Sequence, residues 1–391
     1  MEFYTSVLPY RGRLLVRGVD KDGTHKKYRI NYKPSLFVPV GKETKYKTLD
    51  GRYVERIKFD SMPEATKWVN EYKNVTNFEY FGNTRHQYPF IADEFKGKIK
   101  WDINKIKILT VDIECESENG FPSPEKADQP LICITVKDHI SKKIIVFGIG
   151  SFVNDREDVQ YIDCVTEQGL VETFTKFWVE YNPNIITGWN VKFFDIPYLM
   201  NRFRYLMGDE WIKQYSPWGV VEQRQSLTGF AGNSREQQVW NIMGVDTVDY
   251  LDLYRKFTFV RRESYKLDYI GEVELGQNKL DNPYDTFKEF YSNDYQRFVE
   301  YNIQDVELVD KLEDKLQLIV EMNSTCEGAG AVKAQYDELL AAKMNEIEQL
   351  VLPLLINLKK NGDKDYLYWP GGQRTAQVEL QTERILKIKQ S

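Results

Sequence analysis

Residues 106–116 have the sequence IKILTVDIECE, a strand-forming run that ends in acids. Acids are depleted in strands, and successive side chains of a strand point to opposite faces. Asp112, Glu114 and Glu116 therefore share one face of the predicted strand. Carboxylates this close repel each other unless a cation lies between them, so Asp112 and Glu114 indicate half of a divalent-metal site. A strand whose polar face lies in water is the alternative.

A second informative stretch is residues 185–199, IITGWNVKFFDIPYL. It predicts a short buried strand, a turn at residues 188–190 and a helix that begins near Asp195. Pro197 suits a first helical turn, and Asp195 suits the N-cap position. Capping and metal binding are both open for Asp195.

A third stretch, residues 295–322, has helical periodicity and follows candidate caps at residues 292–294. Tyr301 and Asp305 share one helical face with Leu308 and Leu312. A carboxylate on an apolar face is costly without a partner. A metal ion is one such partner for Asp305, and a salt bridge or hydrogen bond is the other.

Together, the three stretches resemble the exonuclease motifs of the 3′-5′ proofreading domain in family B DNA polymerases. The matching patterns are Asp112-x-Glu114, Asn190-x-x-x-Phe194-Asp195 and Tyr301-x-x-x-Asp305. The flanking sequence is similar to the replicative polymerases of T-even-like tailed phages over roughly residues 1–322. This resemblance implies an α/β, ribonuclease-H-like fold for the exonuclease domain.

The resemblance also implies a chemistry, namely two-metal hydrolysis of the terminal phosphodiester of a single-stranded DNA or primer-template 3′ end. It gives metal binding to Asp112, Glu114, Asp195 and Asp305, and the orientation of water to Tyr301. It gives substrate binding to Asn190, Phe194, Phe121 and Lys279. Oxygen ligands favour two Mg²⁺ or Mn²⁺ ions, and the chain has only 3 histidines, which argues against zinc.

Several of these substrate residues also have a plain structural explanation. Phe121, Phe194, Trp189 and Phe193 are candidates for stacking on unpaired bases, but such aromatic residues are more often core. Lys279 matches a lysine near the metal site by resemblance, and a solvated surface lysine is the alternative.

Residues 1–104 predict a small α+β domain with one helix. Residues 20–24 predict a hairpin turn, because they contain Asp-Gly between two strand-like runs. Prolines make residues 33–40 an edge strand. The helix covers residues 61–72, with Ser61 as its cap. By resemblance, this domain contacts the template strand.

The predicted exonuclease domain, residues 105–322, contains further elements. Residues 131–136 and 143–149 predict strands, residues 169–180 predict a helix, and residues 220–245 predict a long hairpin around residues 229–234. By resemblance this hairpin helps to part primer from template, and a plain extension of a sheet is equally open.

Residues 323–391 predict a linker and a helical tail of unknown role. The nucleotide-binding and metal-binding motifs of family B polymerase sites are not found in the 391 residues. We therefore expect no DNA synthesis by this chain, and a separate polymerase chain or another replisome protein is an open candidate partner.

Composition limits the class of protein. Hydrophobic residues make up 42% and charged residues 29% of the chain, as in ordinary globular proteins. No apolar run is long enough for a membrane span, and the four cysteines have no C-x-x-C spacing. We expect a cytoplasmic protein, in the host cell if it is phage-encoded. The net charge of -6 does not by itself indicate nucleic-acid binding.

Three functions are compatible with these features of the sequence. The first is a metal-dependent 3′-5′ exonuclease of the proofreading type. The second is a non-catalytic nucleic-acid-binding or polymerase-binding module of a split or truncated replicase. The third is an exoribonuclease with the same metal site. The intact set of four acids and Tyr301 favours a nuclease, and the long similarity to DNA polymerases favours DNA as substrate.

Overall fold

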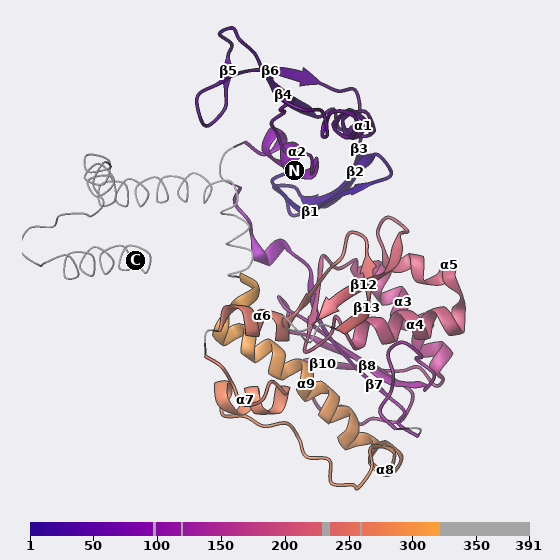
Figure 1. Ribbon diagram of the computed structural model, residues 1–391. Helices are drawn as coiled ribbons and strands as arrows, with labels where there is room; N and C mark the ends of the chain where they lie inside the picture. The colour runs from indigo at the N-terminus through magenta and orange to yellow at the C-terminus, as the bar shows by residue number, and fades with distance from the viewer. Residues whose placement is uncertain (97–98, 119, 229–234, 259, 321–391) are drawn as a thin grey trace, which may run out of the picture. The chain divides into compact units, whose positions relative to one another are not determined.

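The computed structural model describes residues 1–96, 99–118, 120–228, 235–258 and 260–320 (Figure 1). One compact unit contains the described residues of Met1–Lys96 and those from Lys100 onward. The predicted tail, residues 323–391, lies outside the described residues. The predicted domain boundary at residue 104 stays a prediction.

The chain begins with an antiparallel sheet in the order β1-β2-β3. Its strands are β1 (Phe3–Tyr10), β2 (Arg13–Val19) and β3 (His25–Ile30). The turn between β2 and β3 is closed by a hydrogen bond from the Gly23 amide to the Asp20 carbonyl, 2.9 Å long. Gly23 has a φ of 83°, which a residue with a Cβ rarely adopts. The predicted hairpin turn is confirmed.

A second small sheet has the order β4-β6-β5. Its strands are β4 (Ser35–Pro39), β5 (Tyr46–Lys47) and β6 (Tyr53–Lys58). β4 lies at an edge, as its prolines predict. Helix α1 (Met62–Tyr72) follows, and the Ser61 hydroxyl accepts a hydrogen bond from the Glu64 amide, 3.3 Å long. The predicted cap is confirmed.

The prediction of one helix in residues 1–104 is wrong, because α2 (Gln87–Glu94) is a second one. Its first turn has no side-chain cap, so the usual start signal is missing. The helix instead buries Phe90 against Val7, Val16 and Met62. Such tertiary packing can stabilise a short helix whose own sequence would not be helical in isolation.

The central sheet has six strands in the order β10-β9-β8-β7-β11-β14. They are β7 (Ile108–Cys115), β8 (Leu131–Asp138), β9 (Ile144–Gly148), β10 (Val159–Asp163), β11 (Ile185–Gly188) and β14 (Asp246–Asp249). β7 pairs antiparallel with β8 but parallel with β11. This mixed sheet with helices on both faces is the predicted ribonuclease-H-like architecture.

Figure 1 shows helices on opposite sides of β7 and β8. One face packs against α3 (Glu167–Tyr181) and α4 (Asp195–Met207). The other packs against α8 (Phe287–Asn293) and α9 (Tyr295–Leu316). Along β7, Val111 and Ile113 belong to the core beneath α3 and α4. The alternation of a strand therefore turns Asp112 and Glu114 toward α9.

Helix α9 begins where the sequence predicts and ends earlier. The Asp294 carboxylate caps it by accepting a hydrogen bond from the Arg297 amide, 3.1 Å long. It ends at Leu316 rather than residue 322, because Gln317 adopts a left-handed conformation with a φ of 52°. The Glu313 carboxylate accepts hydrogen bonds from the amides of Ile319 and Val320 and stabilises this turn.

The remaining elements connect these layers. β12 (Val221–Thr228) and β13 (Arg235–Ile242) form the predicted long hairpin, whose residues 229–234 lie outside the described residues. The short helices are η1 (Ile103–Lys105), α5 (Asp209–Ile212), η2 (Lys213–Tyr215), α6 (Tyr250–Phe257) and α7 (Leu267–Leu275). No helix in the described part of the chain has the length and hydropathy to span a bilayer.

Candidate functional site

A cavity of about 610 Å³ lies where the end of β7, the turn after β11 and α9 meet. All the residues predicted for the site line it: Asp112, Glu114, Phe121, Asn190, Phe194, Asp195, Lys279, Tyr301 and Asp305. Trp189 lines it too. Four segments that are distant in the sequence therefore contribute to one site.

The acidic centre of the cavity consists of Asp112, Glu114 and Asp305. One carboxylate oxygen of each lies within 4.8 Å of the others. Oδ1 of Asp305 is buried and has no hydrogen-bond partner among the residues that the structure describes. Buried polar atoms are normally satisfied, so an unpartnered carboxylate oxygen beside two other carboxylates fits a bound cation. The all-oxygen donor set suits a hard divalent ion such as Mg²⁺.

Asp195 lies at the start of helix α4, where the sequence predicts a helix to begin. It is the first residue of α4, and the N-cap is Phe194, which makes no side-chain cap. The alternative that Asp195 caps the helix does not hold, because its Oδ1 instead accepts a hydrogen bond from the Ile113 amide of β7, 3.2 Å away. The carboxylate thus turns toward the sheet and the other acids.

Burial and mutual repulsion act on all four carboxyl groups. Burial, then the neighbouring carboxylates, raise the pKa of Glu114 to about 8 and that of Asp112 well above its usual range. Burial raises the pKa of Asp195 to about 7, although the Ile113 amide opposes this shift. Burial also raises the pKa of Asp305, against the effect of Lys279. The site therefore favours protons or a cation near neutral pH.

Lys279 and Tyr301 lie beside Asp305. The Lys279 ammonium forms an ion pair with Oδ2 of Asp305 and lies 3.5 Å from the Tyr301 hydroxyl. The alternative of a solvated surface lysine is thus wrong. Burial lowers the pKa of Lys279, but Asp305 outweighs it and the net shift is upward. Burial raises the pKa of Tyr301 to about 12, so its phenol stays protonated and can donate a hydrogen bond.

The aromatic residues of the cavity differ in exposure. The Phe121 side chain is 86% exposed, and its ring centroid lies 5.4 Å from that of Phe194. The Trp189 ring instead packs near Tyr250 and Tyr254, and its Nε1 donates to the Tyr265 carbonyl. Phe121 is therefore the aromatic side chain most open to a ligand. Phe193 is not among the residues that line this cavity.

Two residues of the site were not predicted. Asn302 donates a hydrogen bond from Nδ2 to Oδ2 of Asp112. Asp249 accepts hydrogen bonds from the amides of Asn190 (3.2 Å) and Lys192 (3.0 Å), and so holds the turn after β11. Asp249 also caps α6, and an acid between a strand and a helix is a signal that could have found it. A buried asparagine in a helix gives no comparable signal.

The family model described as "DNA polymerase family B, exonuclease domain" matches residues 64–270, more than half of the 391 residues. The chain belongs to this family. The predicted resemblance is therefore confirmed. The matched range begins inside the predicted N-terminal domain, so it does not coincide with the boundary expected at residue 104.

The relatives of this chain include DNA polymerases that are much longer than the segment it matches. It is 30% identical to the DNA-directed DNA polymerase of Escherichia phage RB69 over 347 residues, which cover 81% of this chain and 38% of that polymerase. It is 29% identical to that of Enterobacteria phage T4, again covering 38% of the polymerase. The DNA polymerase delta catalytic subunit of Caenorhabditis elegans is 28% identical over 56% of the chain. The chain thus spans less than two fifths of the phage polymerases it matches.

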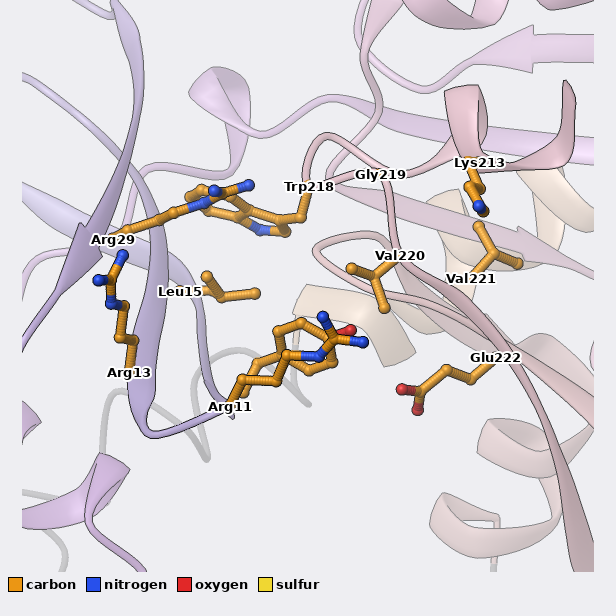
Figure 2. Close-up of a pocket in the computed structure, with 11 residues that line it drawn as sticks. Arg11, Arg13, Leu15, Arg29, Lys213, Trp218, Gly219, Val220, Val221 and Glu222 are labelled. Carbon is orange, nitrogen blue, oxygen red and sulfur yellow. The ribbon is translucent and has the colours of Figure 1, made fainter. Parts of the chain in front are cut away.

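The family B exonuclease chain has a second cavity, of about 700 Å³, which is basic (Figure 2). Arg11, Arg13 and Arg29 line it from the N-terminal sheet, and none of them forms an ion pair with an acid of the described residues. Figure 2 shows the Arg29 side chain alongside Trp218, and its guanidinium carbon lies 5.8 Å from the ring centroid. Guanidinium groups without acidic partners favour an anionic ligand.

Proposed function

We propose that this chain is a metal-dependent 3′-5′ exonuclease of the proofreading type, which acts on single-stranded DNA ends. The observation that carries this proposal is the group formed by Asp112, Glu114 and Asp305, whose oxygens lie within 4.8 Å of one another in a family B exonuclease domain. The unpartnered oxygen of Asp305 supports a cation at this position.

Two divalent cations, Mg²⁺ or Mn²⁺, would neutralise charge on the phosphodiester and lower the pKa of a water nucleophile. Asp112 and Asp305 would hold the ion on the side of the attacking water. Glu114 would help to hold that ion and contact the last nucleotide. Asp195 would hold the second ion, largely through water.

Tyr301 and Lys279 act beside these acids without being ligands. The Tyr301 phenol, with its pKa of about 12, would orient the water through its hydroxyl rather than remove a proton from it. The Lys279 ammonium compensates the charge of Asp305 and keeps that side chain in place. Both groups therefore fix geometry at the same carboxylate.

The substrate would enter beside Phe121. Its exposed ring, with Phe194 behind it, would stack on an unpaired base, while Asn190 lines the same cavity. Stacking is tolerant of base identity, so we expect little sequence preference. The basic cavity of Arg11, Arg13 and Arg29 would contact the phosphodiester backbone of a template strand.

The same basic cavity would also serve a non-catalytic nucleic-acid-binding module, which is the second candidate function. Turnover separates the two candidates. A 5′-labelled single-stranded DNA is incubated with the chain and Mg²⁺, beside an EDTA control and the double variant Asp112→Ala/Glu114→Ala. We expect a ladder that shortens from the 3′ end and is lost in both controls.

An RNA oligonucleotide of the same sequence completes the test, because a faster cleavage of RNA would identify an exoribonuclease instead. Binding of the DNA without cleavage, by a folded wild-type chain with Mg²⁺, would contradict the exonuclease and support the binding module.

A further inference from the structure

The side chain of Asn302 links the acidic centre to the neighbouring strand. Asn302 is fully buried in α9, with 0% of its surface exposed. Its Nδ2 donates to Oδ2 of Asp112 in β7, and its Oδ1 accepts from the Thr135 hydroxyl in β8. The Cys133 thiol, 3.4 Å from the same Oδ1, is a weaker second donor. One amide therefore joins three elements of the fold.

The chemistry of its partners fixes the orientation of this amide. An ionised Asp112 can only accept hydrogen bonds, so it requires the NH₂ group of Asn302. The Thr135 hydroxyl then donates to the remaining amide oxygen. The flipped amide would place its oxygen against the Asp112 carboxylate, and a repulsive contact would replace an attractive one. Asp112 thus selects this orientation of Asn302, and the Thr135 hydroxyl, which can donate or accept, adds a second hydrogen bond that holds it.

The hydrogen bond to Asn302 occupies only Oδ2 of Asp112. The torsion of an aspartate carboxylate about its last bond is otherwise broad. With Oδ2 held, the carboxylate is restrained beside Glu114 and Asp305, with which it shares the acidic centre. We propose that Asn302 is a positioning residue that orients Asp112 toward a bound divalent cation, with Thr135 in turn holding Asn302.

This inference rests on the proposed metal site and adds a residue to it. Asn302 lies among the buried side chains of Phe298, Val299 and Ile303 on α9, where an apolar residue would satisfy packing. A buried amide is costly unless its hydrogen bonds are made. Partners of metal-binding groups typically change metal affinity or activity by about 10- to 100-fold when they are removed.

The test is Mn²⁺ binding by the full chain, measured by titration calorimetry without DNA. Asn302→Leu removes the hydrogen bonds and keeps the bulk of the side chain. Asn184→Leu is the matched control, because Asn184 is also buried and its Oδ1 accepts from the Lys107 amide just before β7. We expect both variants to melt at lower temperature, but only Asn302→Leu to weaken Mn²⁺ binding, by at least about tenfold.

Thr135→Val keeps the shape of the side chain and removes the hydroxyl, so it tests the same chain of contacts if Asn302→Leu does not fold. We expect a smaller but measurable loss of Mn²⁺ affinity. A purely structural role predicts instead a lower melting temperature with unchanged Mn²⁺ affinity, and that result would overturn the inference.

The outcomes separate this inference from the proposed function. Wild-type Mn²⁺ affinity in Thr135→Val and in folded Asn302→Leu would overturn the role of Asn302 alone. No Mn²⁺ binding by the wild-type chain would overturn the metal site and this inference with it. Weakened Mn²⁺ binding in the variants, without DNA cleavage by the wild type, would support the inference and contradict the exonuclease.

Discussion

Asp305 and Asp310, two of the buried acids on helix α9, have opposite kinds of surroundings. Asp305 and Asp310 are 4% and 3% exposed. Asp310 has positively charged partners on both oxygens, with Lys137 at 2.9 Å and Lys142 at 2.8 Å. Asp305 has Lys279 on one oxygen and, within the described part of the chain, no partner on the other. A structural acid is fully satisfied within the protein, whereas the acid in the cavity keeps one oxygen for a ligand.

The two acids also differ in their proton affinity. Burial alone would raise the pKa of Asp310, but the neighbouring His139, Lys142 and Lys137 outweigh it and lower the pKa below its usual range. At Asp305 burial prevails over Lys279 and the pKa is raised. Three basic side chains lie beside Asp310, whereas Lys279 is the cation that pairs with Asp305 in the described part of the chain.

The largest effect is expected from Asp305→Asn. This change keeps the shape of the side chain and removes a metal-binding charge, so cleavage should fall by about 10³-fold, equivalent to about 4 kcal/mol of transition-state stabilisation. Single-turnover cleavage of labelled DNA measures it. The matched control is Asp310→Asn, which should cleave like wild type below its melting temperature. Equal losses of cleavage in the two variants would contradict the assignment of Asp305 to the site and of Asp310 to a structural role.

The next largest effect is on folding. Asp310→Asn leaves Lys137, whose side chain is 9% exposed, buried without a full countercharge. Removing one partner of a buried ion pair costs about 3 kcal/mol. Urea unfolding at pH 7 should show this loss for Asp310→Asn and a smaller change for Asp305→Asn. A larger loss at Asp305 would mean that it, and not Asp310, is the structural acid.

The pH dependence sharpens the same comparison. The folded pKa of Asp310 lies below its unfolded value of about 3.9, so the folded state binds fewer protons there. The stabilisation is therefore complete above about pH 4 and is lost as the pH falls further toward the folded pKa. The difference in unfolding free energy between wild type and Asp310→Asn should shrink between pH 4 and pH 2. A constant difference over this range would show that the charge of Asp310 is not the cause.

The smallest effect concerns the acidic centre without metal. Asp112→Asn/Glu114→Gln removes like charges, so the metal-free variant should be more stable than the wild type at pH 8, by about 1 kcal/mol. Added Mg²⁺ should raise the melting temperature of the wild type but not of the variant. Calorimetry with and without EDTA measures both. Equal responses to Mg²⁺ would place the cation elsewhere.

The sequence alone was sufficient to predict site residues that lie on a regular strand or helix. The alternation of a strand placed Asp112 and Glu114 on one face, and helical periodicity placed Asp305 on a buried stripe. For Asp195 the sequence left capping and metal binding both open, because a cap and a contact across to β7 have the same local sequence signal. Only the tertiary fold distinguishes them.

The unpredicted residues share a physical reason. Asn302 bonds to residues 167 and 190 positions away, and Lys142 lies 168 positions from Asp310. No local periodicity reports such pairs. The end of α9 was predicted too late in the sequence for a related reason. The Glu313 carboxylate stabilises a left-handed turn there, and the turn contains no glycine that would have indicated it.

The carboxylate of Asp249 accepts hydrogen bonds from the main-chain amides of Asn190 and Lys192 in the turn after β11, and from those of Leu251 and Asp252 in α6. Every residue type except proline supplies such an amide. These contacts therefore constrain the backbone of the turn without constraining the side chains at positions 190 and 192. At position 190, which lines the cavity, the φ of 67° is a separate constraint that favours asparagine or glycine. One buried carboxylate thus ties the start of α6 to a loop that presents a side chain to the cavity.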